Sequence, residues 1–206
     1  MHISEGVLSA PVLVAGAAVA VAGISVGLRR MDTDNIPKVA VLSSAFFVAS
    51  LIHVPLGPAS VHLILNGISG ILLGWLSFPS IFIALTLQAI LFQFGGITTL
   101  GVNTVVMALP AVICFYLFRV YVRRDNGFLF YASAFSCGAL SVFLSCILVA
   151  AALISTEKSF MTVAKLIVVA HLPIMVIEGI MTLFCLLFLK KVRPELLEYV
   201  NGTNPQ

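Results

Sequence analysis

The chain has 206 residues, of which 61% are hydrophobic and only 9% are charged, and its formal net charge is +3. Its mean hydropathy is +1.16, and soluble domains carry about 25% charged residues, so an ordinary soluble domain is excluded. No charged residue occurs from Val39 to Phe118 or from Asn126 to Thr156. The sequence therefore predicts an all-α, polytopic membrane helical bundle, organised as a single transmembrane domain over residues 1–206.

A window of about 20 residues, the length of helix that crosses a bilayer, predicts seven transmembrane helices. In chain order, the predicted spans cover roughly 7–28, 39–56, 60–76, 79–94, 103–122, 128–154 and 160–189. The third and fourth spans are short, so tilted or partly re-entrant segments are an alternative there. The four cysteines lie inside apolar spans without CxxC spacing, and we interpret them as packing residues.

The basic residues predict how the bundle is oriented. Nine follow the first, fifth and seventh spans: Arg29, Arg30, Lys38, Arg119, Arg123, Arg124, Lys190, Lys191 and Arg193. Only Lys158 and Lys165 fall on the opposite side. The positive-inside rule then places the N-terminus outside and the C-terminus in the cytoplasm. We expect the first span to be retained, because no basic residue precedes it and its apolar run is about twice that of a signal peptide.

The segment 1–6, ahead of the first span, is a candidate metal-binding segment. When histidine is second in a chain, the α-amine of Met1, the His2 amide nitrogen and the His2 imidazole can bind one ion through small chelate rings. A fourth nitrogen would complete a square plane, which is typical of Ni(II) or Cu(II). Met1 is expected to remain, because aminopeptidases remove methionine only before small residues.

Further polar residues gather at the predicted outer end of the bundle. His53 ends the second span, His62 begins the third, and Asn103 opens the fifth. His171 lies about 16 Å into the seventh span, at 1.5 Å per residue. Together with His2, all four histidines of the chain thus fall toward one face, and this arrangement favours a shared metal site.

Each of these residues also has a structural interpretation. His53 would cap a helix or face the interface, and Ser60 would hold His62 one turn inside a helix by capping it. His171 precedes Pro173 and would satisfy carbonyl groups that the proline leaves unpaired. Glu178 is an acid inside a span, which costs roughly 2.5–3.5 kcal/mol and usually marks a functional cavity or a buried partner.

Small residues recur at helical spacing and predict close helix packing, within the chain or between chains. Two such stripes lie on the first span and one on the third: Gly16, Ala20, Gly23 and Gly27; Ala18 and Ala22; Gly67, Gly70 and Gly74. The sequence contains no nucleotide-binding motif, so energy for transport would come from a partner or an ion gradient. The positive charge belongs to membrane-edge clusters and does not indicate nucleic-acid binding.

Four segments in family order resemble the CbiM/NikM proteins, the substrate-binding components of energy-coupling-factor cobalt and nickel importers. These segments run from Met1 to Leu8, Pro58 to Gly67, Phe92 to Asn103 and His171 to Gly179. The resemblance implies a seven-helix bundle with its N-terminus outside, in the plasma membrane of a bacterium or archaeon. It also implies a transporter subunit without catalytic residues and without a cofactor, whose bound ion is the transported substrate.

The resemblance further implies which residues hold the metal. In the family, the donors are the N-terminal amine, the main-chain and side-chain nitrogens of the second residue, and a later histidine. Here these correspond to Met1, His2 and His62. The residues expected to support these donors are Glu5, His53, Asn103, His171 and Glu178. The stretch before His62 departs from the family pattern, which leaves both nickel and cobalt open, and square-planar nitrogen ligation favours nickel.

The implied partners are a transmembrane coupling protein, two ATPase subunits and a small accessory membrane protein, in a lipid bilayer. Two alternatives differ in class. A self-sufficient ion-coupled carrier would usually contain more spans and more intramembrane acids than Glu178 alone. An intramembrane serine protease would use the Gly-x-Ser-Gly sequence of residues 67–70 with His171, but the polar cluster on the second helix that such proteases need is missing.

Overall fold

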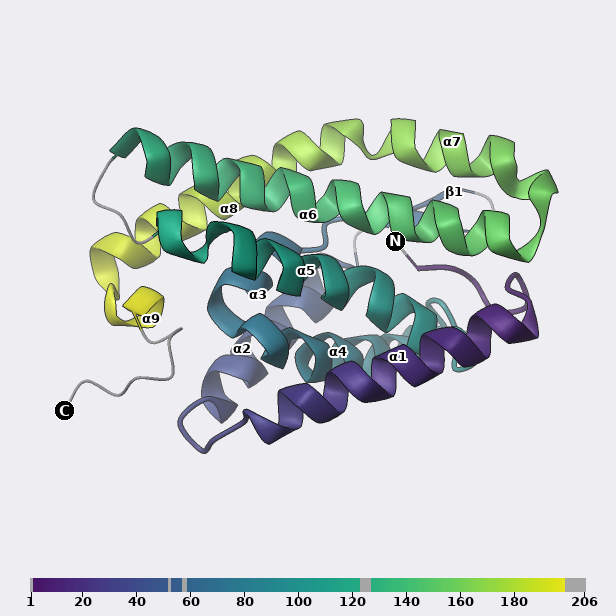
Figure 1. Cartoon of the computed structure of the whole chain (residues 1–206), viewed down its shortest axis with the longest axis horizontal. Coiled ribbons are helices and arrows are strands. Elements are labelled where there is room, and N and C mark those ends of the chain that lie inside the picture. Colours follow the sequence, from purple (N-terminus) through teal and green to yellow (C-terminus); the bar gives the residue numbers. More distant parts are fainter. Residues whose placement is uncertain (1, 52, 57–58, 123–126, 199–206) are drawn as a thin grey trace.

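The computed structural model describes residues 2–51, 53–56, 59–122 and 127–198, with the main chain alone at 53–56, 59–61 and 198. In chain order its helices are α1 (Ala10–Arg29), α2 (Ile36–Ala49), α3 (Asn66–Leu73), α4 (Ser77–Phe92), α5 (Leu100–Val122), α6 (Gly127–Thr156), α7 (Met161–Ala170), α8 (Leu172–Val192) and α9 (Glu195–Glu198). Strands β1 (His53–Leu56) and β2 (Ala59–His62) follow α2, and short 3-10 turns occupy Gly74–Leu76 and Lys158–Phe160. Figure 1 shows the helices arranged as one elongated bundle.

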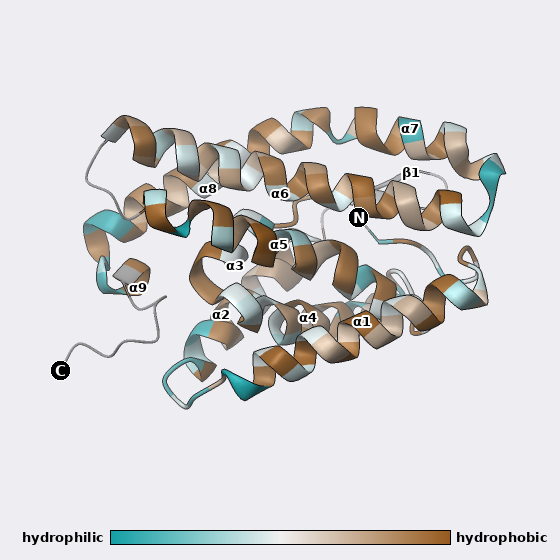
Figure 2. Cartoon of the chain, in the orientation of Figure 1, coloured by the Kyte–Doolittle hydropathy of each residue, from teal (hydrophilic) through white to brown (hydrophobic). Residues whose placement is uncertain are grey.

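The helices have the length and composition of membrane spans. Among the described residues, five segments are long and apolar enough to cross a bilayer: Ala10–Arg29, Asn66–Phe92, Leu100–Val122, Gly127–Thr156 and Lys158–Val192. The shorter helix α2 is also apolar. Hydrophobic residues run along these helices, and hydrophilic ones concentrate near their ends (Figure 2). The predicted helical membrane bundle is confirmed, and its orientation stays a prediction.

Two central helices organise the bundle. Helix α5 packs against α1, α3 and α4, and α6 packs against α5, α7 and α8 (Figure 1). One small-residue stripe of α1 faces inward, because a Cβ at Gly16 would collide with Val102 and one at Gly23 with Phe78. Ala18 and Ala22, on the other stripe, are exposed. The inward stripe therefore serves packing within the chain.

The segment between α2 and α3 differs from the predicted helical spans 39–56 and 60–76. Helix α2 ends at Ala49, and β1 pairs with β2 as an antiparallel hairpin in which His53 lies opposite His62. Helix α3 begins only at Asn66. A hydropathy window registers apolar residues but not the missing N–H groups of Pro55 and Pro58, which disfavour a helix interior. The hairpin instead pairs its own main-chain groups, as an apolar environment requires.

The predicted seventh span, 160–189, is also not one continuous helix. Helix α7 ends at Ala170 and α8 starts at Leu172, with His171 as the residue between them. Pro173 lies at the start of α8. A proline fits the first turn of a helix but disrupts a helix interior, so the chain begins a new helix here.

Glu178 of α8 holds the junction between β2 and α3. Its side chain is fully buried, and its Oε1 accepts hydrogen bonds from the main-chain N–H groups of Ile64 and of Leu65, the latter at 2.8 Å. Leu65 has a left-handed conformation, with φ of 54°, which is unusual for a residue with a side chain. One carboxylate thus stabilises an irregular stretch of main chain that begins two residues after His62.

We predict that Glu178→Leu lowers stability, because it leaves the buried N–H of Ile64 unpaired, at a cost of about 1–3 kcal/mol, and also removes the acceptor of the part-buried Leu65 N–H. Glu178→Gln keeps an acceptor oxygen and should melt close to the wild type. The apparent melting temperature of purified protein in detergent measures both. Equal melting of Glu178→Leu and the wild type would show that this carboxylate does not secure the junction.

Candidate metal centre

The segment before α1 lies inside the bundle rather than on its surface. His2 is 4% exposed and Ile3 is fully buried. Asn103, in the first turn of α5, accepts the Ile3 N–H through Oδ1 at 2.9 Å and donates through Nδ2 to the Ile3 carbonyl at 3.1 Å. The same Nδ2 donates to Thr99 Oγ1 at 3.1 Å. This amide therefore pairs with the N-terminal main chain as a neighbouring strand would.

This placement brings His2 and His62 together. The two ring centroids lie 4.6 Å apart with the planes tilted by 35°, and His62 is 2% exposed. His62 ends β2, so the hairpin that replaced the predicted helix carries it to the buried N-terminal segment. Two complete predicted spans separate these histidines in the sequence, and the structure places their rings side by side. That they bind a metal stays a prediction.

Hydrogen bonds define which nitrogen of His2 carries the lone pair. The Gln88 side chain on α4 donates through Nε2 to the Phe47 carbonyl at 3.2 Å and to Ser50 Oγ, so its Oε1 faces His2. That oxygen lies 2.7 Å from His2 Nε2. Because an amide oxygen can only accept, Nε2 donates, and the lone pair is on Nδ1. Nδ1 is the ring nitrogen that can close a small chelate ring with the His2 amide nitrogen.

His62 shows the complementary arrangement. Its Nδ1 lies 2.7 Å from the Leu63 carbonyl, to which it donates, so the lone pair is on Nε2. Metal-binding histidines usually donate their other ring nitrogen in this way, which fixes the ring and makes it more basic. His2 and His62 therefore present one donor nitrogen each in a buried site.

The arrangement suits an ion that accepts nitrogen donors from the main chain. Across residues 2–51, 53–56, 59–122 and 127–198, no group of three or more His, Cys, Asp or Glu side chains could hold a metal. A metal at the two histidines would therefore need further donors of another kind. The amide nitrogen of His2 is adjacent, and Met1, whose amine is the remaining predicted donor, lies outside the described residues.

The loop between α4 and α5 covers this segment. Phe94 lies 6.3 Å from His2 between ring centroids. Gly95, with φ of 76°, sits where a Cβ would come within 2.8 Å of Asn103 Nδ2. Glu5 is exposed and accepts the Thr98 N–H at 3.3 Å, so it contacts the covering loop rather than the histidine pair.

The remaining predicted residues have different positions. His171 is buried at the corner between α7 and α8, donates through Nδ1 to the Ile167 carbonyl at 2.7 Å, and is close enough to His62 to interact electrostatically. Its Nε2 has no hydrogen-bond partner in the described part of the chain. Glu178 supports the main chain after His62. The main chain of His53 pairs with that of His62 in the hairpin, and only the main chain is described at this residue.

Gln88 and Ser50 were not predicted from the sequence as part of the site. Gln88 is fully buried and its side chain contacts His2. Ser50 Oγ accepts a hydrogen bond from Gln88 Nε2 and donates one to the Phe46 carbonyl at 2.7 Å. A signal was present, because Gln88 is an amide in a helix of otherwise apolar and hydroxyl side chains. Polar side chains inside membrane spans usually face a partner or a cavity.

Similarity to known proteins identifies the family of this chain. The family described as "CbiM: Cobalt uptake substrate-specific transmembrane region" matches residues 2–196. A putative metal transport protein of Haemophilus influenzae is 44% identical over 203 residues, covering 96% of this chain and 97% of that protein. A fused nickel transport protein, NikMN, of Rhodobacter capsulatus is 37% identical over 114 residues, covering 52% of this chain and 33% of that protein.

A solved structure shares the fold. A crystal structure described as a transition metal transporter superposes with a TM-score of 0.76 at 22% identity, covering 98% of this chain and 99% of that chain. At this identity the likeness supports the architecture alone. The family match and the Haemophilus relative each span nearly the whole sequence. The chain therefore belongs to the CbiM family, whose members are multi-pass membrane components of cobalt and nickel transport rather than enzymes.

Proposed function

We propose that this chain is the metal-binding component of an energy-coupling-factor importer and captures Ni²⁺ or Co²⁺ from outside the cell. The observation that carries the proposal is the buried pair of His2 and His62, in which hydrogen bonds direct the lone pairs to Nδ1 and Nε2 respectively. With the His2 amide nitrogen and the Met1 amine, this pair supplies four nitrogens. A nitrogen-only set in one plane suits nickel better than zinc or calcium.

Capture and release follow from the position of the donors. The N-terminal segment is held by the two Asn103 bonds to Ile3, by the Gln88 bond to His2 and by the burial of the Ile3 side chain in the core. Withdrawing that segment would remove three of the four donors at once. Metal release would then need only this local movement and no rearrangement of the central helices α5 and α6.

Partners would supply the energy for this movement. A coupling protein and two ATPase subunits, with a small accessory membrane protein, would convert ATP hydrolysis into release toward the cytoplasm. The stripe of Ala18 and Ala22 lies on an exposed face of α1 and is available for contact with them. A carrier driven by an ion gradient is the second candidate, and Glu178 would then be its titrating group. The structure favours a supporting role for Glu178, because two N–H groups occupy its Oε1.

The role of His62 is tested by His62→Ala, with Ser44→Ala as the control, because Ser44 is exposed on α2 and bonds the Ala40 carbonyl of its own helix. Removing His62 deletes one donor and should weaken nickel and cobalt binding by orders of magnitude, whereas Ser44→Ala should keep the wild-type metal stoichiometry. Isothermal titration of metal-free protein in detergent gives both affinities. Wild-type affinity in His62→Ala would remove this histidine from the site.

The role of Gln88 is tested by Gln88→Met, which keeps the side-chain length and removes the acceptor for His2 Nε2. Loss of a partner behind a metal ligand typically costs 10–100-fold in affinity. We expect that loss while the apparent melting temperature of the metal-free protein changes by only a few degrees. Thr86→Val, also on α4, is the control, because Thr86 bonds the Phe82 carbonyl of its own helix. Unchanged affinity in Gln88→Met would mean that His2 does not depend on this amide.

A further inference from the structure

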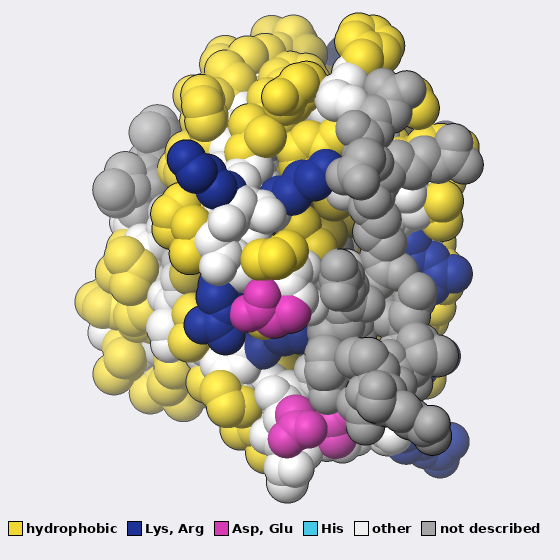
Figure 3. All heavy atoms as spheres, turned by 90° about the vertical axis from the view of Figure 1, so that its left-hand side faces the viewer, with side chains coloured by type: hydrophobic (Ala, Val, Ile, Leu, Met, Phe, Trp, Pro, Cys, Tyr) yellow, Lys and Arg dark blue, Asp and Glu magenta, His cyan; other side chains and the backbone are white. Residues whose placement is uncertain are grey.

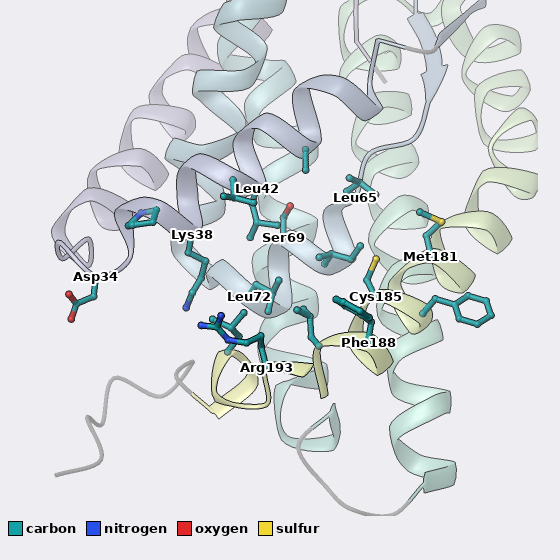
Figure 4. A pocket seen from close by; sticks show the side chains of 17 residues that line it. Asp34, Lys38, Leu42, Leu65, Ser69, Leu72, Met181, Cys185, Phe188 and Arg193 are labelled. Carbon is teal, nitrogen blue, oxygen red and sulfur yellow. The ribbon is translucent and has the colours of Figure 1, made fainter. Parts of the chain in front are cut away.

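A groove of about 840 Å³ opens between α2, α3 and α8. Its walls are almost entirely apolar: Leu42, Ile68, Leu72, Met181, Phe184 and Phe188 lie along it (Figure 4). Ligand-binding clefts usually enclose about 300–1,000 Å³, so the groove has the size of a ligand site.

The short helix α3 explains why the groove exists. Helix α3 has only 8 residues and forms the floor, whereas α2 and α8 extend beyond it as walls. Val41 on one wall is 68% exposed, and Phe184 and Phe188 on the other are 64% and 63% exposed. In a bilayer these side chains face hydrocarbon, so the groove is a place where a lipid chain can lie against the protein.

One end of the groove has an excess of positive charge, because the segments 29–38 and 190–198 beside it contain six Lys and Arg residues against four Asp and Glu residues. Lys38 and Arg193 line it there together with Asp34, and Figure 4 shows the two basic side chains at the same end. Arg193 is held by an ion pair from its Nε to Glu195. Figure 3 shows Lys and Arg side chains over this end of the molecule, with apolar side chains around them and Asp and Glu side chains beside them. The nearby chain segments also contribute Arg29, Arg30, Lys190 and Lys191.

We propose that this groove binds an anionic glycerophospholipid, with an acyl chain along α3 and the headgroup phosphate at Lys38 and Arg193. The apolar walls match the acyl chain, and basic pockets between membrane helices characteristically bind anionic headgroups. A transmembrane helix of a partner would match the walls but would bring no anion to the basic end. The charged end is the one that the basic residues predict to be cytoplasmic, where anionic lipids concentrate. The proposal does not depend on which ion the histidine pair binds.

The experiment measures lipid retained by the purified full chain. Detergent-solubilised protein is incubated with phosphatidylglycerol or phosphatidylcholine of identical acyl chains, and bound lipid is counted by native mass spectrometry. We expect phosphatidylglycerol to be preferred, by about fivefold for each of the two basic residues. The double variant Lys38→Gln/Arg193→Gln should lose that preference. Lys158→Gln/Lys165→Gln, which removes the same charge from exposed sites elsewhere, should keep it.

A second variant tests the apolar part of the groove without disturbing the core. Ala45 is exposed and lines the groove, so Ala45→Phe should block the acyl chain and reduce retention of both lipids. Ala22→Phe, at an exposed position of α1, is its control. Equal retention of the two lipids by the wild type, or unchanged retention in Ala45→Phe, would overturn the proposal. A dimer or a stoichiometric second protein that Ala45→Phe removes would also overturn it, because a polypeptide would then occupy the groove.

Discussion

The two hydrogen bonds between Asn103 and Ile3 are the interaction on which the site depends. The end of a chain is normally disordered. A chelator built from the first two residues therefore needs a fixed main chain in a buried position. Asn103 provides this by pairing with both main-chain groups of Ile3, at 2.9 and 3.1 Å. These hydrogen bonds offset part of the free-energy cost of burying main-chain N–H and C=O groups that would otherwise be unpaired. His2 reaches Gln88 and His62 only because Ile3 is held in this way.

The second constraint lies on the other side of the site, in the hairpin β1–β2. A helix through residues 60–65 would have placed His62 on a helix face, where its neighbours are set by the helical repeat. The hairpin instead ends at His62. The chain continues without regular structure through Ile64 and Leu65, whose N–H groups donate to Glu178 on α8. The acid inside the span is therefore explained by main-chain donors that no regular element satisfies. Irregular main chain at membrane depth requires such internal partners.

Hydropathy predicted most helices within a few residues, because a membrane-spanning helix corresponds to one long run of apolar residues. Helix α5, for example, covers Leu100–Val122 where the predicted span was 103–122. Two predicted helices were wrong at residues 53–56 and 60–62, which form strands, because prolines disfavour a helix through their missing N–H groups and not through polarity. His171 was predicted inside one span but lies at a helix break, where Pro173 starts α8. His2, His62 and Asn103 were predicted to share a site, and the structure brings them together. Gln88 was missed because its role depends on the helix face that meets His2, and hydropathy does not report that face.

The central claim is that the α-amine at the chain start is a metal donor, and blocking that amine tests it most directly. Nickel and cobalt affinities should be measured by titration calorimetry for protein with a free Met1 amine and for the same protein acetylated there. Every side chain remains in both samples, and a tag after Gln206 serves as the control for modification at a chain end. The account predicts that acetylation abolishes high-affinity binding while the C-terminal tag leaves it unchanged. Equal affinities for the free and acetylated proteins would contradict it and leave a buried histidine pair without the chelating main chain.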